Sequence, residues 1–152
     1  MRSERPDTLV ELKVRALRFL ARREHSRAEL ARKLAPHAES PAVLDTVLSE
    51  LAAKRQLSDE RYAEVRTHWL ARKYGAAKIR QNLKAHGVAD AVIERVSAEG
   101  DYERAKAILA RKYRKPATTR EERAKRGRFL QSRGFSYDVI VRVLKLEDNE
   151  ND

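Results

Sequence analysis

Apolar residues in the first third of the chain recur every three or four positions, which is the period of one face of an α-helix. They form three blocks, with apolar positions at Leu12, Ala16, Phe19 and Leu20; at Ala28, Leu30, Ala31 and Leu34; and at Val43, Leu44, Val47, Leu48, Leu51 and Ala52. Ser26 and Glu29 predict a capping box, in which the hydroxyl accepts from a helix amide and the carboxylate reaches back. Pro36 ends the second block, and Ser40 begins the third as its cap. The pattern predicts three short amphipathic helices.

The same landmarks return twice further along the chain. Leu34, Leu83 and Leu130 follow one another at intervals of 49 and 47 residues, and a second landmark at Leu44, Ile93 and Ile140 keeps the same two intervals. A third landmark, the Leu-Ala-Arg-Arg/Lys sequence at 20–23, 70–73 and 109–112, recurs at intervals of 50 and 39. The agreement predicts a tandem repeat, with an insertion between the first two helices of its third copy.

Cap and turn residues mark the helices of the later copies as well. In copy two, Ser58 and Asp59 begin the first helix, Gly87 ends the second and Asp90 caps the third; in copy three, Gly134 marks the turn and Ser136 the cap. Helices that are apolar on one side only must share a core with neighbouring copies. We therefore expect an all-α fold of three tandem three-helix repeats forming an elongated, curved array. The expected boundaries are an N-terminal tail at 1–9, repeats at 10–57, 58–100 and 101–146, and a frayed acidic tail at 147–152.

Charge changes this picture because it is concentrated in one place. The chain of 152 residues carries 34 Lys and Arg against 23 Asp and Glu, a net charge of +11. Residues 103–128, at the insertion in copy three, hold 11 basic and 3 acidic residues, whereas residues 1–102 hold 20 and 15. The stretch reads as helix, short loop and helix, with residues 119–122 opening the second helix. Such a patch indicates a polyanionic partner, of which nucleic acid is the commonest, or else a solvated face with no partner.

Several other classes of protein are disfavoured. The chain has no cysteine, which excludes disulfides and thiolate metal sites. Its four histidines lack metal-ligand spacing, no glycine-rich phosphate loop is present, and most carboxylates lie three or four residues from a cation. We expect no enzyme, no cofactor and no metal. No apolar run approaches a membrane span and no secretory signal begins the chain, which predicts a cytoplasmic protein.

The segment from Ser26 to Leu34 resembles the first helix of a helix-turn-helix reader of DNA. The following helix, however, carries Asp45, Thr46, Ser49 and Glu50 on its polar side, and carboxylates are repelled by a phosphate-lined groove. Tyr74 and Tyr113 hold matching positions among cations, where a tyrosine either stacks on a base or fills space between helices. Both alternatives stay open at the level of sequence.

Three segments in order carry a resemblance to the RecX family of bacterial regulatory proteins. These are Leu57-Ser58-Asp59-Glu60-Arg61-Tyr62-Ala63, then Lys78-Ile79-Arg80-Gln81-Asn82-Leu83 with Gly87-Val88, and finally Phe129-Leu130 with Arg133-Gly134-Phe135-Ser136-Tyr137-Asp138-Val139-Ile140. The resemblance implies a helical modulator of the RecA recombinase that binds the groove of the RecA–DNA filament, mainly inhibits RecA, and acts in DNA repair, recombination and the SOS response. It implies no catalytic residues. One departure is Arg126, which stands where the earlier copies have Leu30 and Ile79.

The family motifs are mostly core and turn positions, so candidate contact residues come from charge alone. The first set is Arg104, Arg111, Arg114, Lys115, Arg123, Lys125 and Arg128, and the second is Arg72, Lys73, Lys78 and Lys84. The expected partners are a RecA filament and, weakly, single- or double-stranded DNA. Polar outer faces on the terminal repeats favour a monomer. The alternative function is a free-standing helix-turn-helix-like protein that binds duplex DNA.

Overall fold

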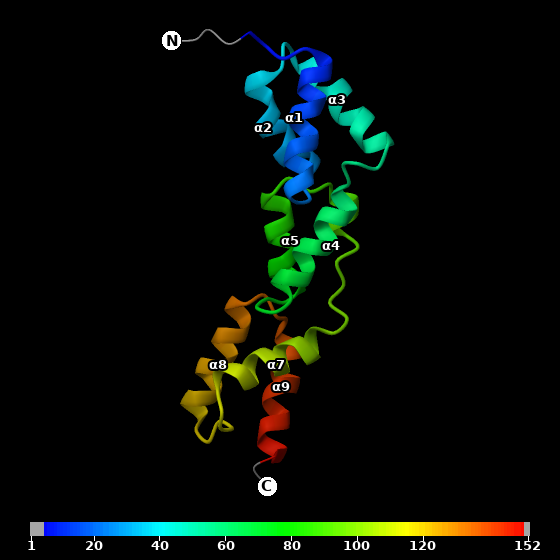
Figure 1. The fold of residues 1–152 in the computed structure, drawn as a ribbon. Coiled ribbons are helices and arrows are strands. Elements are labelled where there is room, and N and C mark those ends of the chain that lie inside the picture. Colours follow the sequence, from blue (N-terminus) through cyan, green and yellow to red (C-terminus); the bar gives the residue numbers. More distant parts are fainter. Residues whose placement is uncertain (1–4, 151–152) are drawn as a thin grey trace. The chain divides into compact units, whose positions relative to one another are not determined.

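The computed structural model describes residues 5–150, with side chains up to Lys145, and the regular elements of this part of the chain are all helices (Figure 1). Its elements are α1 (Leu9–Arg22), α2 (Arg27–Leu34), the 3-10 helix η1 (Ala35–His37), α3 (Pro41–Ala53), α4 (Asp59–Leu70), α5 (Ala76–Ala85), α6 (Asp90–Ile93), α7 (Asp101–Lys112), α8 (Arg120–Ser132) and α9 (Tyr137–Glu150). The predicted grouping of three α-helices per repeat is confirmed. The third helix of the second repeat, α6, is only one turn long.

Helix starts follow the predicted capping residues. The hydroxyls of Ser26, Ser40 and Thr119 each accept a hydrogen bond from the amide three residues on, at 3.1–3.2 Å, and Ser58 and Ser136 do the same at 3.2 and 3.3 Å. Each bond satisfies an amide that has no partner within its helix, which stabilises the helix by about 1 kcal/mol.

Two expectations about helix ends are corrected. Glu29 does not complete a capping box with Ser26; its carboxylate accepts from both terminal nitrogens of Arg23, at 2.9 and 2.7 Å, because a guanidinium offers a charged, two-pronged donor. The acidic tail expected from residue 147 is helical up to Glu150, since α9 continues through it. Its last two residues, 151 and 152, lie outside the described residues, as do residues 1–4 of the N-terminal tail.

The chain divides into two compact units. Unit 1 comprises residues 1–65 and 83–92, and unit 2 comprises residues 66–82 and 93–152. Unit 1 holds the whole first repeat and unit 2 the whole third repeat, while the second repeat contributes to both (Figure 1).

Each unit has its own apolar core, made from the positions that the periodicity marked. In unit 1, the buried residues from the three helices of repeat one are Leu12, Ala16, Leu30, Leu34, Val47, Leu48 and Leu51, joined by Leu57. In unit 2, they are Ala105, Ile108, Leu109, Leu130, Phe135, Ile140 and Val143. Burying a leucine in this way contributes about 1.5–3 kcal/mol.

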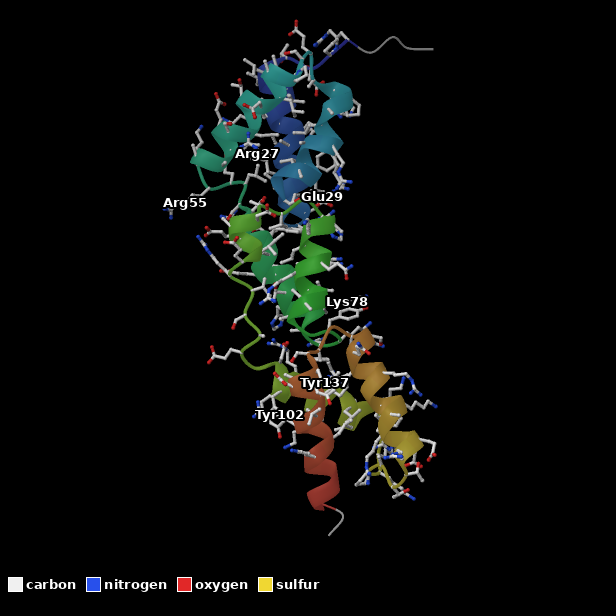
Figure 2. All side chains as sticks on the ribbon, turned by 180° about the vertical axis from the view of Figure 1, so that it is seen from behind. Arg27, Glu29, Arg55, Lys78, Tyr102 and Tyr137 are labelled. Atoms are coloured by element: carbon white, nitrogen blue, oxygen red, sulfur yellow. The ribbon has the colours of Figure 1, made fainter. Side chains whose placement is uncertain are left out.

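Consecutive repeats are joined by a glycine that ends the second helix. Gly87 (φ +75°) lies against α2, where an added Cβ would come within 2.4 Å of Ala28 Cβ. Gly134 (φ +88°) lies against α5, where it would come within 2.5 Å of Lys78 Cβ and 2.6 Å of the Lys78 amide nitrogen (Lys78 is labelled in Figure 2). Both the left-handed backbone and the close approach require glycine at these positions.

The same junctions are also held by a carboxylate from the start of the next repeat. Asp59 accepts hydrogen bonds from the amides of Arg27 and Ala89, at 2.8 and 3.0 Å. Asp101 accepts from the amide of Ala76, at 3.1 Å to its nearer oxygen, and also binds Arg104. In both repeats, the first residue of one helix therefore caps the second helix of the repeat before it.

Candidate nucleic-acid interface

The basic stretch folds as predicted, with α7, a loop at 113–119 and α8. Arg126 fixes the loop: it is 6% exposed, its guanidinium carbon lies 4.3 Å from the centre of the Tyr113 ring, and its Nη2 donates to the Lys115 carbonyl at 2.8 Å. This is the different packing that an arginine in place of Leu30 and Ile79 demands. The side chains of Arg114 and Lys115 on the same loop are exposed.

A second contact holds the loop at its far end. The amide of Thr118 donates to the Glu122 carboxylate at 2.8 Å. This bond, together with the amide of Thr119, lowers the pKa of Glu122 below its ordinary value, because both amides favour the ionised form. The loop backbone is thereby tied to α8 on both sides of Ala117, which is fully buried.

Most of the predicted contact residues lie exposed in unit 2. Seven of them are exposed and take part in no ion pair among the described residues: Arg72, Lys73, Arg111, Arg114, Lys115, Lys125 and Arg128. Lys78 is also exposed in this unit, although its backbone carries the Gly134 contact. Arg123 is half-buried and engaged with other groups.

Two predicted contact residues, Arg104 and Lys84, do not belong to this group of exposed cations in unit 2. Arg104 binds the carboxylate of Asp101, which is 3% exposed, with Nε at 3.1 Å. The Arg104 guanidinium therefore neutralises the buried Asp101 carboxylate at the junction between repeats, because a buried carboxylate needs a partner. Lys84 belongs to unit 1, so the structure does not group it with the other candidates.

The two predicted sets meet at the turn that follows α4. The guanidinium of Arg111, from the end of α7, donates to the carbonyl of Arg72, and Arg133, from the end of α8, donates to the carbonyl of Lys73 at 3.4 Å. The carbonyl end of a helix carries partial negative charge, which favours cations around it. Arg111 is thus brought to Arg72 and Lys73, although it lies 39 residues after Arg72 in the sequence.

Aromatic rings are interleaved with these cations, partly as predicted. Tyr113 packs edge-on against Phe129, with ring centres 6.4 Å apart, and Lys112 Nζ lies 4.1 Å from the Phe129 ring centre. Arg133 lies over Tyr74 at 5.4 Å. Tyr113 packs against the core of unit 2, which confirms the space-filling alternative for it.

One aromatic residue of this surface was missed from the sequence. Trp69, on α4, is 63% exposed, and the guanidinium carbon of Arg72 lies 5.2 Å from its ring centre. The available signal was a tryptophan followed, three and four residues later, by two consecutive cations. We name the surface made by Trp69, Arg72, Lys73 and Arg111 the α4-turn cluster.

Unit 1 offers no comparable surface on its helix-turn-helix-like segment. Arg27 of α2 binds Asp45 at 2.7 Å and Ser49 at 3.0 Å, both on the polar face of α3. Asp45 keeps 76% of its side chain exposed, so α3 presents carboxylate to solvent, as expected. A groove-reading helix would instead present cations or amides there.

The described part of the chain has neither a cluster of metal ligands nor a membrane-spanning helix. No group of three or more His, Asp or Glu side chains there is arranged to hold a metal ion. No helix there is long and apolar enough to cross a membrane.

By its fold, the chain is an all-α protein of tandem three-helix units. Models of the first, second and third three-helix domains of RecX match residues 13–51, 58–96 and 99–144, respectively. The chain therefore belongs to the RecX family, as its motifs predicted.

Individual relatives agree with this assignment. A Regulatory protein RecX from Leptothrix cholodnii is 46% identical over 155 residues, covering 100% of this chain and 98% of the relative. Another of that name, from Ralstonia nicotianae, is 43% identical over 146 residues, covering 94% and 92%. The crystal structure of RecX from Lactobacillus salivarius has the same fold, with a TM-score of 0.81, 22% identity, and coverage of 92% of this chain and 96% of that one.

Proposed function

We propose that this protein regulates RecA by binding the RecA–DNA filament and limiting its activity, without catalysing a reaction itself, and that unit 2 supplies the contacts to DNA. The observation that carries the proposal is the group of seven exposed cations in unit 2 without ion-pair partners among the described residues. A cation that is paired with a carboxylate binds phosphate weakly, because the carboxylate already neutralises it. An unpaired cation releases counterions when it binds a nucleic-acid backbone, and this release favours binding.

The relatives support the regulatory part of the proposal, since those compared are named regulatory proteins. The choice of RecA as the target follows from the family resemblance and from the charge pattern. A filament of protein on DNA offers phosphates together with protein surface, which suits a chain whose excess charge is concentrated on one unit. Binding of this kind adds up from many modest contacts and needs no deep pocket.

The alternative function, free-standing recognition of duplex sequence, has less support. Its reading helix would be α3, and the exposed polar side of α3 carries Asp45 and Glu50. Carboxylates at those positions would face the phosphates that line a groove and lower the affinity.

The test is to measure the ATPase and strand-exchange activities of a bacterial RecA with this protein present at substoichiometric amounts. The variant combines Arg111→Glu, Arg114→Glu and Lys115→Glu. The matched control combines Arg18→Glu, Arg22→Glu and Arg32→Glu, three exposed cations of unit 1, so that both variants change the net charge equally. We expect the wild type and the control to inhibit, and the unit 2 variant to lose most of the inhibition.

Salt gives an independent measurement of the same contacts. If about six phosphates are neutralised, the affinity for DNA falls roughly a thousandfold between 50 and 200 mM salt. The unit 2 variant should flatten the slope of log K against log salt by about 3, whereas the control should leave it unchanged. Equal inhibition by all three proteins, or a flat salt response of the wild type, would contradict the proposal. Tight, sequence-dependent duplex binding without an effect on RecA would favour the alternative.

A further inference from the structure

Trp69 lies exposed although tryptophan is among the residues that gain most from burial. It keeps 63% of its surface exposed on α4. A single exposed apolar residue is ordinary on a protein surface. Val65, four residues earlier on α4, is also exposed, at 50%. What sets Trp69 apart is the cation over its ring, because the Arg72 guanidinium lies against the exposed indole.

The cations of the α4-turn cluster come from two segments, the turn after α4 and the end of α7. Arg72 and Lys73 follow Trp69 by three and four residues, in the turn directly after the end of α4 at Leu70. The Arg72 guanidinium lies over the ring at 5.2 Å. Arg111 reaches the same turn from α7 by its hydrogen bond to the Arg72 carbonyl.

Among the described residues, these charges have no acidic partner that neutralises them. None of the three cations takes part in an ion pair among the described side chains. An exposed ring with one cation over it and two more cations at the adjoining turn complements a ligand that brings a flat π-face and negative charge together. A nucleotide in a single strand has both, because its base stacks and its phosphate carries the charge.

We propose that Trp69 is a stacking platform for an unpaired nucleobase of single-stranded DNA, with Arg72, Lys73 and Arg111 binding the phosphates beside it. This inference rests on the proposed function, in which unit 2 meets the nucleic acid of the filament, and adds which strand form is bound and by which residue. The bases of a duplex are already stacked on one another, so their faces are closed to the indole. The cluster therefore favours a single strand over a duplex of the same charge.

The experiment uses the fact that Trp69 is the only tryptophan of the chain. Its intrinsic fluorescence reports on this one position, so the full-length protein can be titrated without a label. The probes are a short oligothymidylate, a duplex of equal length, and an abasic deoxyribose-phosphate strand of equal length. We expect strong quenching by the oligothymidylate, and little by the duplex or the abasic strand.

Affinity is measured on the variants Trp69→Leu and Trp69→Phe with an end-labelled strand. Trp69→Leu should weaken binding of the oligothymidylate about 5- to 150-fold, the loss expected for one stacked base, and leave binding of the abasic strand unchanged. Trp69→Phe should recover part of the affinity, because a smaller ring still stacks. The control is Tyr137→Ala, which removes another exposed aromatic residue of unit 2, 78% exposed and labelled in Figure 2.

The outcomes separate this inference from the proposed function. If Trp69→Leu binds the oligothymidylate as wild type does, with the salt dependence intact, the stacking platform is wrong and the basic surface stands. If the fluorescence responds only when RecA is added, and Trp69→Leu weakens binding to the filament alone, Trp69 contacts protein and the inference is again overturned. If the wild type binds neither DNA nor filament, the proposed function itself fails.

Discussion

The carboxylate of Asp101 joins two repeats, and its removal gives the sharpest test of the fold. Asp101 is 3% exposed at the start of α7. It accepts a hydrogen bond from the Ala76 amide at 3.1 Å, in the first turn of α5, and pairs with Arg104. We therefore expect Asp101→Ala to lower the stability of unit 2 more than any substitution of an exposed carboxylate.

The magnitude follows from the groups left behind. The Ala76 amide belongs to a residue that is 1% exposed, and a buried amide without a partner costs about 1–3 kcal/mol. Arg104, whose side chain is 26% exposed, also loses its partner and raises the total to about 3 kcal/mol. For a chain of this length, that loss corresponds to a fall in Tm of roughly 6–12 °C. Asp101→Asn keeps an acceptor for the amide, so it should cost about half as much.

The assay combines thermal unfolding with amide hydrogen exchange. Exchange resolves the residue concerned, because the Ala76 amide should lose its protection in Asp101→Ala before the core of unit 1 changes. Glu103→Ala removes an exposed carboxylate from the same turn of α7 and should stay within about 0.5 kcal/mol of wild type. Equal Tm values for Asp101→Ala and Glu103→Ala, or unchanged protection at Ala76, would contradict this expectation.

Three further outcomes are expected. Arg126→Ala removes the bond to the Lys115 carbonyl, so trypsin should cut the loop at 113–119 several-fold faster, whereas Lys125→Ala should not expose it. Burial lowers the pKa of His25, with the charges of Arg23 and Lys33 adding to the effect, so the unfolded chain takes up the proton first. Stability is therefore lost as pH falls through about 6.5 toward the folded-state pKa, and urea midpoints of His25→Gln should show less of this loss. Arg55 has φ 59°, in the left-handed region, so Arg55→Gly should raise the free energy of unfolding, by up to about 1 kcal/mol; a lower urea midpoint would contradict this (Arg55 is labelled in Figure 2).

The fold was predictable because its signals are local. Leu12, Leu30 and Leu34 each belong to a run of apolar residues with helical period, and each is fully buried as that period predicts. The caps at Ser26, Ser40 and Thr119 depend on bonds to amides only three residues away, so sequence spacing alone identifies them. The arginine at position 126 stood out as a departure from the repeat, and its burial against Tyr113 agrees with that reading.

The candidate site was predictable only in part. Local charge density marked Arg111, Arg114 and Lys115, which are exposed. The same density also marked Arg104, which pairs with Asp101 three residues away. Asp101 is buried where it binds the Ala76 amide at the start of α5, and that contact is not visible in the local sequence. Composition counts a paired and an unpaired cation alike, and only the tertiary structure distinguishes the two.

By itself, the sequence determined the helices, their caps, the threefold repeat and the place of the excess charge. Each of these follows from the identities of residues within a few positions of one another, where the backbone fixes the geometry. Tertiary structure decided which cations are paired with carboxylates and which are exposed to a partner. It also brought Arg111 to the turn beside Arg72, whose guanidinium lies over Trp69. It also decided that Gly87 and Gly134, which read as simple helix ends, carry the junctions between repeats. Those outcomes depend on contacts between segments distant in the chain, whose packing no local pattern encodes.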